Sequence, residues 1–147
     1  FKKINDTLGH AAGDVILRDV AKVITESTCD KSIYCRWGGE EFLAFTYCDH
    51  DCAESAERIR SAIEEHSFTF EGRVIPVTVS GGVCTSNVLN PDILEQMTRV
   101  ADECLYQAKH SGKNQIKVTH LEQAVDAPEF SSFGQTHSGA GYMQAEK

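Results

Sequence analysis

The sequence lacks any long apolar run, and none approaches the roughly 18 residues that a membrane-spanning helix requires. It also lacks a basic excess, because 14 Lys and Arg stand against 22 Asp and Glu and give a net charge of −8. Such an acidic chain is poorly suited to bind nucleic acid, which requires a basic surface, so we expect no nucleic-acid partner. No signal peptide opens the sequence, and its six cysteines form no C-x-x-C pair. We therefore expect reduced, mostly buried thiols and a cytoplasmic location.

Several widespread catalytic motifs are also absent. The sequence contains no G-x-x-x-x-G-K-[ST], G-x-G-x-x-G, H-E-x-x-H or G-x-S-x-G. The segment nearest to the end of a P-loop is Ser111-Gly112-Lys113-Asn114, which lacks both the earlier glycine and the hydroxyl after the lysine. An enzyme acting on nucleotides would therefore need another device to hold phosphates.

The 147 residues, 41% of them hydrophobic, suit one domain with a real core. Residues 1–119 have the periodicities of a globular domain, whereas residues 120–147 have no sustained period and are predicted to form a flexible tail. Hairpins between helices favour an α+β sandwich, with helices packed on an antiparallel-rich sheet. The predicted elements are a helix after Gly13-Asp14, strands 33–37 and 42–47, a helix over 52–63, strands 68–70 and 75–79, a helix from 91 to Gly112, and a strand over 115–119.

The main candidate for chemistry is the turn Gly38-Gly39-Glu40-Glu41 between two aromatic, β-prone runs. Bare glycines let a backbone approach a phosphate closely, and carboxylates on the same turn can hold Mg²⁺. Neighbouring strand residues point to opposite faces, so Glu40 and Glu41 should have different roles. The same pattern is also typical of an ordinary Gly-Gly turn with two solvated acids.

A second candidate is the segment from Asn5 to Asp14, where two glycines, an amide and two acids lie between apolar stretches. An amide together with a carboxylate can recognise the edge of a purine. The alternative is a loop whose Asp14 caps a helix beginning near Val15.

A third candidate comprises Lys109 and Lys113, at the predicted end of the last helix. Two cations in this position can clamp phosphates. They also suit the negative end of the helix dipole and need no ligand there.

Taken together, these segments resemble the GGDEF family, the diguanylate cyclases, with Gly38-Gly39-Glu40-Glu41-Phe42 as the signature in its GGEEF form. Further matching segments keep the order of the family over residues 1–119. They are Phe1 to His10, Gly13-Asp14, Arg36-Trp37, Val77 to Ser80, and Ala101 to Lys109.

The resemblance implies a ferredoxin-like nucleotide-cyclase palm that condenses two GTP into cyclic di-GMP and releases two pyrophosphates. It implies that Gly38 and Gly39 meet the phosphates, that Glu40 binds Mg²⁺ (or Mn²⁺), and that Glu41 lies near the attacking hydroxyl. It also implies roles for four further residues. Asn5 and Asp14 would recognise guanine, and Lys109 and Lys113 would contact the terminal phosphates.

The resemblance also implies partners. A second GGDEF domain must face the first for catalysis, and a sensory domain is expected upstream, so the chain can be the cytoplasmic part of a larger, membrane-anchored sensor. The family places a metal-binding Asp in a strand just before the position of Phe1, so we expect this first strand to be missing. The competing interpretation is a catalytically inactive module of the same fold that senses GTP or binds a protein.

Overall fold

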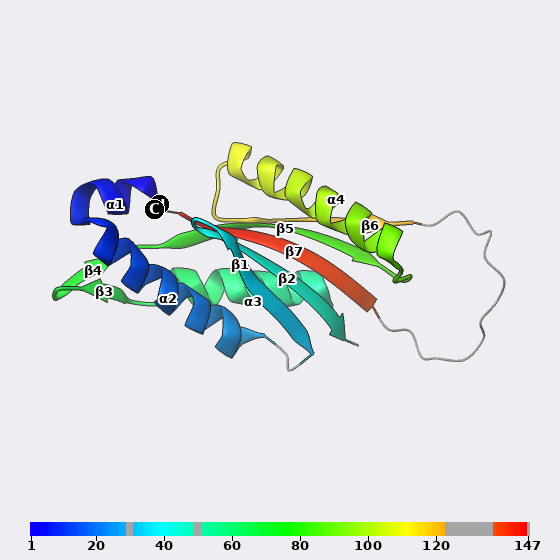
Figure 1. Cartoon of the computed structure of the whole chain (residues 1–147), viewed down its shortest axis with the longest axis horizontal. Coiled ribbons are helices and arrows are strands. Elements are labelled where there is room, and N and C mark those ends of the chain that lie inside the picture. The colour runs from blue at the N-terminus through cyan, green and yellow to red at the C-terminus, as the bar shows by residue number, and fades with distance from the viewer. Residues whose placement is uncertain (29–30, 49–50, 123–136, 147) are drawn as a thin grey trace.

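The computed structural model describes residues 1–28, 31–48, 51–122 and 137–146. Helices and antiparallel hairpins follow one another along the chain, as expected of an α+β domain (Figure 1). In chain order they are α1 (Lys2–Leu8), α2 (His10–Ser27), β1 (Ser32–Gly38), β2 (Glu41–Cys48), α3 (Cys52–Glu65), β3 (Phe68–Phe70), β4 (Arg73–Ile75), β5 (Thr78–Ser86), α4 (Pro91–His110), β6 (Ile116–Leu121) and β7 (His137–Glu146).

The main sheet has five strands in the order β1-β2-β7-β5-β6. Every neighbouring pair is antiparallel except β5 and β6, which are parallel. The predicted antiparallel-rich sheet is therefore confirmed. The second predicted hairpin is shorter than expected, because β3 pairs only with β4 in a separate two-stranded sheet and Val79 belongs to β5.

Helices cover both faces of the main sheet, with α2 and α3 on one side and α4 on the other (Figure 1). Alternation along the strands divides the buried side chains between two cores. Phe42 and Met143 pack with α2 and α3, whereas their neighbours Leu43 and Tyr142 pack with α4. The arrangement is the predicted sandwich of helices on a sheet.

One interpretation of the sequence made the segment from Asn5 to Asp14 a loop. The structure instead places most of this segment in two helices. Gly9, with φ +85°, separates α1 from α2, and Asp14 lies exposed inside α2 without capping it. The chain can turn at residue 9 because glycine, which has no Cβ, adopts a positive φ at little cost. Gly13 serves packing instead, since an added Cβ there would overlap Oδ1 of Asn5.

The predicted flexible tail is wrong over residues 137–146, which form β7, the central strand of the sheet. β6 also continues to Leu121, past the predicted boundary at residue 119. The physical reason is a long slot between β2 and β5, in which β7 hydrogen-bonds on both sides. Small residues make β7 fit close to the helices, because Cβ at Gly139 would come within 2.5 Å of Cys52 Sγ on α3.

The thiols of the described residues agree with the expectation of mostly buried cysteines. Cys52, Cys84 and Cys104 are buried, and Cys35 is exposed. Burial, and to a lesser extent Cys104, raises the pKa of Cys84 to about 11. Across the described ranges, no helix combines the length and the apolar character that crossing a membrane would need.

Candidate functional site

The tip of the β1–β2 hairpin is formed by the predicted glycine turn. Gly39 adopts φ +50°, and Arg36 Nε donates a 2.7 Å hydrogen bond to its carbonyl oxygen. A Cβ added at Gly38 or Gly39 would meet no atom within 4 Å, so open space surrounds both glycines. The backbone of this turn is therefore accessible to a ligand, as a phosphate-binding loop requires.

Glu40 lies at the tip of the hairpin and contacts the end of β7. Gln144 Nε2 donates a 2.9 Å hydrogen bond to Glu40 Oε1, and the Ala145 amide donates one of 3.1 Å to the Glu40 carbonyl. The other amide atom, Gln144 Oε1, is buried and has no hydrogen-bond partner among the described residues. The Glu40 carboxylate therefore lies at the hairpin tip with the Gln144 side-chain nitrogen facing it, and carboxylate oxygen is the kind of ligand that Mg²⁺ prefers.

The Glu40 carboxylate is not part of a complete set of protein ligands for a metal among the described residues. Within the described ranges, no three His, Cys, Asp or Glu side chains are grouped so that they could hold a metal ion. Mg²⁺ commonly binds to one or two protein ligands and takes its others from water and substrate phosphates. A single carboxylate such as Glu40 fits that kind of site.

Glu41, the first residue of β2, faces α4. Its Oε1 atom lies 3.8 Å from Lys109 Nζ in the last turn of that helix. Glu41 also lines a groove of about 680 Å³ with Trp37, Asp102 and Tyr142. Burial raises the pKa of the Tyr142 hydroxyl, and the carboxylates of Asp102 and Glu41 raise it further. Glu40 and Glu41 have different surroundings, because Glu40 lies in the turn and Glu41 begins β2.

Lys113 lies in the turn after α4, where its φ is +63°. Its Nζ atom is 3.8 Å from Oε1 of Glu146, the last residue of β7 that the structure describes. Glu146 is 4% exposed and accepts a 2.9 Å hydrogen bond from Ser80 Oγ. The second predicted cation therefore also faces a carboxylate at this end of the sheet.

Asn5 and Asp14 come together through the turn at Gly9. Asn5 on α1 lies over Gly13 of α2, directly before Asp14. Asp14 lines a groove of about 530 Å³ that also includes Arg36 and Phe42 of the hairpin strands. The carboxylate of Asp14 thus lines a groove that reaches the hairpin, and Asn5 lies over the residue before it.

The structure divides the predicted site residues between two places. Glu40, Glu41, Lys109 and Lys113 gather where α4, the hairpin and β7 end, whereas Asn5 and Asp14 lie on the helices of the opposite face. Sequence reasoning missed Gln144 and Glu146, because both fall in the segment predicted to be a flexible tail. Only the placement of β7 identifies them, since no motif surrounds them.

Comparison with known proteins agrees with this arrangement. The family model described as the GGDEF domain of diguanylate cyclases matches residues 1–115. Diguanylate cyclase A of Treponema denticola is 40% identical over 121 residues, which cover 81% of this chain and 32% of that protein. The response regulator PleD of Caulobacter vibrioides is 40% identical over 120 residues, which cover 79% of this chain and 26% of PleD. The chain thus spans about a third or less of these relatives, and β7 lies outside the range that the family model matches.

Solved structures give the same result for the fold. The diguanylate cyclase SiaD of Pseudomonas aeruginosa, in complex with its activator SiaC, superposes with a TM-score of 0.71 and 29% identity, covering 80% of this chain and 45% of SiaD. The active GGEEF domain of a diguanylate cyclase from Vibrio cholerae superposes with a TM-score of 0.64 and 30% identity. The match covers 84% of this chain and 77% of that domain's chain. The coiled coil and GGDEF domain of DgcB from Caulobacter crescentus, in complex with c-di-GMP, has a TM-score of 0.68 and 26% identity, covering 80% and 63%.

Proposed function

The chain belongs to the GGDEF family, and from this membership we propose that it is the catalytic domain of a diguanylate cyclase. The reaction would join two GTP molecules into cyclic di-GMP. The 3′-hydroxyl of each GTP attacks the α-phosphate of the other, two phosphodiester bonds form, and two pyrophosphates leave.

The observation that carries this proposal is the meeting of the glycine turn, the two carboxylates and the two lysines at one end of the sheet. The accessible backbone of Gly38 and Gly39 would receive the phosphates. Lys109 and Lys113 would contact the terminal phosphates, releasing the carboxylates that lie 3.8 Å from each of them. Two lysines can thus receive a highly charged anion even though the chain as a whole is acidic.

Recognition of guanine is assigned to Asn5 and Asp14. The carboxylate of Asp14 can accept hydrogen bonds from the N1–H and the exocyclic amine of guanine, and the amide of Asn5 can both donate and accept. Adenine presents a different set of donors and acceptors, so the same groups would be left unpaired against it.

Glu40, with Gln144 beside it, would hold Mg²⁺ or Mn²⁺. A divalent ion bound there supplies charge neutralisation at the phosphates and helps to orient the displacement. Glu41 is assigned to the attacking hydroxyl, as the acceptor of its proton. Its carboxylate is 40% exposed at the mouth of a groove, so a substrate can reach it.

One domain would hold one GTP, so the reaction needs a second GGDEF domain facing the first. An upstream sensory domain would control how often two domains meet, and the SiaD structure, solved with an activator protein, is one example of a cyclase with a protein regulator. For this chain, both the second domain and the sensor remain proposals.

Incubation of the chain with GTP and Mg²⁺, followed by chromatography of the nucleotides, tests the proposal. A diguanylate cyclase yields cyclic di-GMP and pyrophosphate. Recovery of unchanged GTP bound to the protein would instead support a GTP-sensing module, and no binding of GTP would leave a protein-interaction module.

A further inference from the structure

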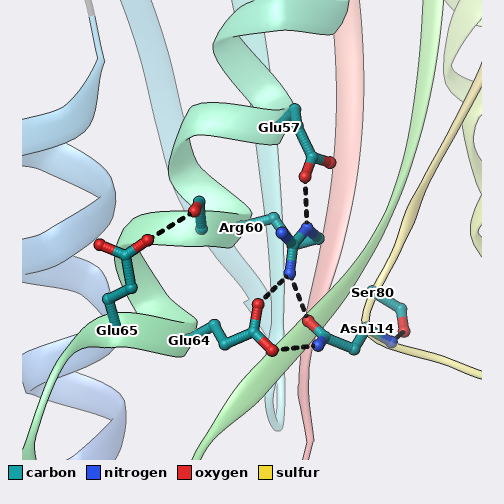
Figure 2. Close-up of polar contacts among 7 residues, drawn as sticks. Glu57, Arg60, Glu64, Glu65, Ser80 and Asn114 are labelled. Carbon is teal, nitrogen blue, oxygen red and sulfur yellow. Dashed lines mark hydrogen bonds and ion pairs between the residues drawn. The ribbon is translucent and has the colours of Figure 1, made fainter.

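A network of charged and polar side chains joins α3 to Asn114 (Figure 2). Arg60, only 14% exposed, donates from Nε to Glu57 Oε1 at 2.7 Å and from Nη1 to Glu64 Oε2 at 2.6 Å. The same Nη1 atom donates a 2.8 Å hydrogen bond to Oδ1 of Asn114. The network therefore reaches from α3 to the turn that follows α4.

Asn114 is held at both ends of its amide. Oδ1 accepts from Arg60, and Nδ2 donates a 2.8 Å hydrogen bond to Glu64 Oε1 (Figure 2). Since Arg60 and Glu64 also pair with each other, the three side chains form a closed ring that fixes the orientation of the amide. We call Arg60, Glu64 and Asn114 the α3 clasp.

The backbone of the same turn is fixed from the sheet. The backbone N–H of Asn114 donates a 3.1 Å hydrogen bond to Ser80 Oγ on β5. Ser80 Oγ in turn donates a hydrogen bond to the Glu146 carboxylate on β7. Lys113 and Asn114 both have positive φ, of +63° and +44°. Positive φ is uncommon for residues other than glycine, although asparagine adopts it more readily than most, and the α3 clasp and Ser80 supply contacts that hold Asn114 in this conformation.

The side chains of Lys113 and Asn114 leave this turn toward different partners. Asn114 enters the α3 clasp, whereas the 57% exposed Lys113 extends toward Glu146 and the end of the sheet. A change in the anchorage of Asn114 would therefore shift where the Lys113 ammonium lies, although none of the clasp residues belongs to the proposed phosphate site.

We propose that Asn114 is a positioning residue, held by Arg60 and Glu64, which places Lys113 to receive the terminal phosphates of a nucleoside triphosphate. This inference rests on the function proposed above, because it takes Lys113 to be a phosphate ligand. It adds three residues that touch no substrate.

The test measures binding of α,β-methylene-GTP, which cannot release pyrophosphate, and of GMP, which has no terminal phosphates, by calorimetry with Mg²⁺. Asn114→Gly removes the amide and keeps the positive φ that glycine readily adopts. Lys113→Gln should lower the affinity for the triphosphate analogue about tenfold or more, as expected for loss of a hydrogen bond to a charged group. Asn114→Gly should produce a large part of that loss, and both variants should bind GMP as the wild type does.

Two comparisons separate positioning from general damage. The double variant should bind the analogue no more weakly than Lys113→Gln alone, because both changes remove the same contact. Ser61→Ala is the matched control, since it deletes a hydrogen bond to Glu65 on α3 outside the clasp and should leave binding unchanged. If Asn114→Gly does not fold, Arg60→Gln opens the clasp from the other side and should show the same loss of the triphosphate alone.

The possible failures are distinguishable. If the wild type binds neither nucleotide, the proposed function fails, and this inference fails with it. If Lys113→Gln weakens the analogue but opening the clasp does not, the positioning role is wrong and the proposed function stands. Additive losses in the double variant, or equal weakening of GMP and the analogue, would also overturn the positioning role.

Discussion

Lys109 Nζ lies 3.8 Å from Glu41 Oε1, so the end of α4 is paired with the first residue of β2. The contact joins two segments that are far apart in the sequence and that separately carry the proposed phosphate ligand and the proposed proton acceptor. In the proposed enzyme, binding of a triphosphate to Lys109 would release the Glu41 carboxylate toward the substrate hydroxyl. The predictions below test this site and the strand that completes it.

Glu40→Ala should abolish turnover of GTP. The variant removes the carboxylate assigned to Mg²⁺, and Gln144 presents its amide nitrogen there, which cannot replace an oxygen ligand. We expect a loss of orders of magnitude in the rate, measured as cyclic di-GMP formed over a titration of Mg²⁺. Glu54→Gln, an exposed change on α3, is the control and should keep the wild-type rate. Near-normal synthesis by Glu40→Ala would contradict the assignment.

Asp14→Asn should reduce the preference for GTP over ATP. The carboxylate can accept two hydrogen bonds from guanine, and an unpaired polar group in a binding site costs about 1–3 kcal/mol, which is roughly 5- to 160-fold in affinity. Competition by ATP against GTP binding provides the measurement. Asp19→Asn makes the same chemical change on α2 at a residue that does not line the groove, so it should preserve selectivity. Equal affinities of the wild-type chain for ATP and GTP would refute the guanine site.

Two glycines of β7 test whether this strand lies in the sheet. At Gly139 a Cβ would come within 2.5 Å of Cys52 Sγ and 2.8 Å of Cys52 Cβ, whereas at Gly141 its nearest neighbour would be 3.7 Å away. Gly139→Ala should therefore lower the free energy of unfolding by about 1–3 kcal/mol, the usual cost of overpacking. Gly141→Ala should change it much less. Equal stabilities of the two variants in urea denaturation would show that β7 does not occupy this slot.

The buried thiol of Cys84 should react slowly at neutral pH, because burial raises its pKa to about 11 and the thiolate is the reactive form. Exposed Cys35 should be alkylated first, as peptide mapping by mass spectrometry can measure. The raised pKa also makes the free energy of unfolding depend on pH. The stabilisation from keeping the Cys84 thiol protonated is complete below pH 9 and is lost as the pH rises through about 11. Reaction of Cys84 as fast as Cys35 at pH 7 would contradict its burial.

The parts of the fold that local signals specify could be predicted from the sequence. The Gly-Gly turn between aromatic runs identified β1 and β2, and apolar spacing identified α3 and α4 with few errors at their ends. The hairpin carries the proposed catalytic acids, and α4 carries Lys109. Most of the candidate site was therefore visible before any tertiary contact was known.

The parts that depend on tertiary packing could not be predicted. Gly9 and Gly13 look alike in the sequence, yet one breaks the helix by its backbone conformation and the other accommodates Asn5. β7 has small residues and little intrinsic preference for strand, so its place depends on the slot between β2 and β5. Consequently Gln144 and Glu146, which contact Glu40 and Lys113, were missed.

If two copies of this domain condense GTP, product stoichiometry in a forced dimer will show it. The chain is fused to a parallel coiled coil, since two free domains would meet only by weak collisions. We predict one cyclic di-GMP for every two pyrophosphates, at a higher rate than from the unfused chain, and loss of both products in the fused Glu41→Gln variant. Absence of cyclic di-GMP from the fused wild type, or an equal yield from Glu41→Gln, would contradict the account.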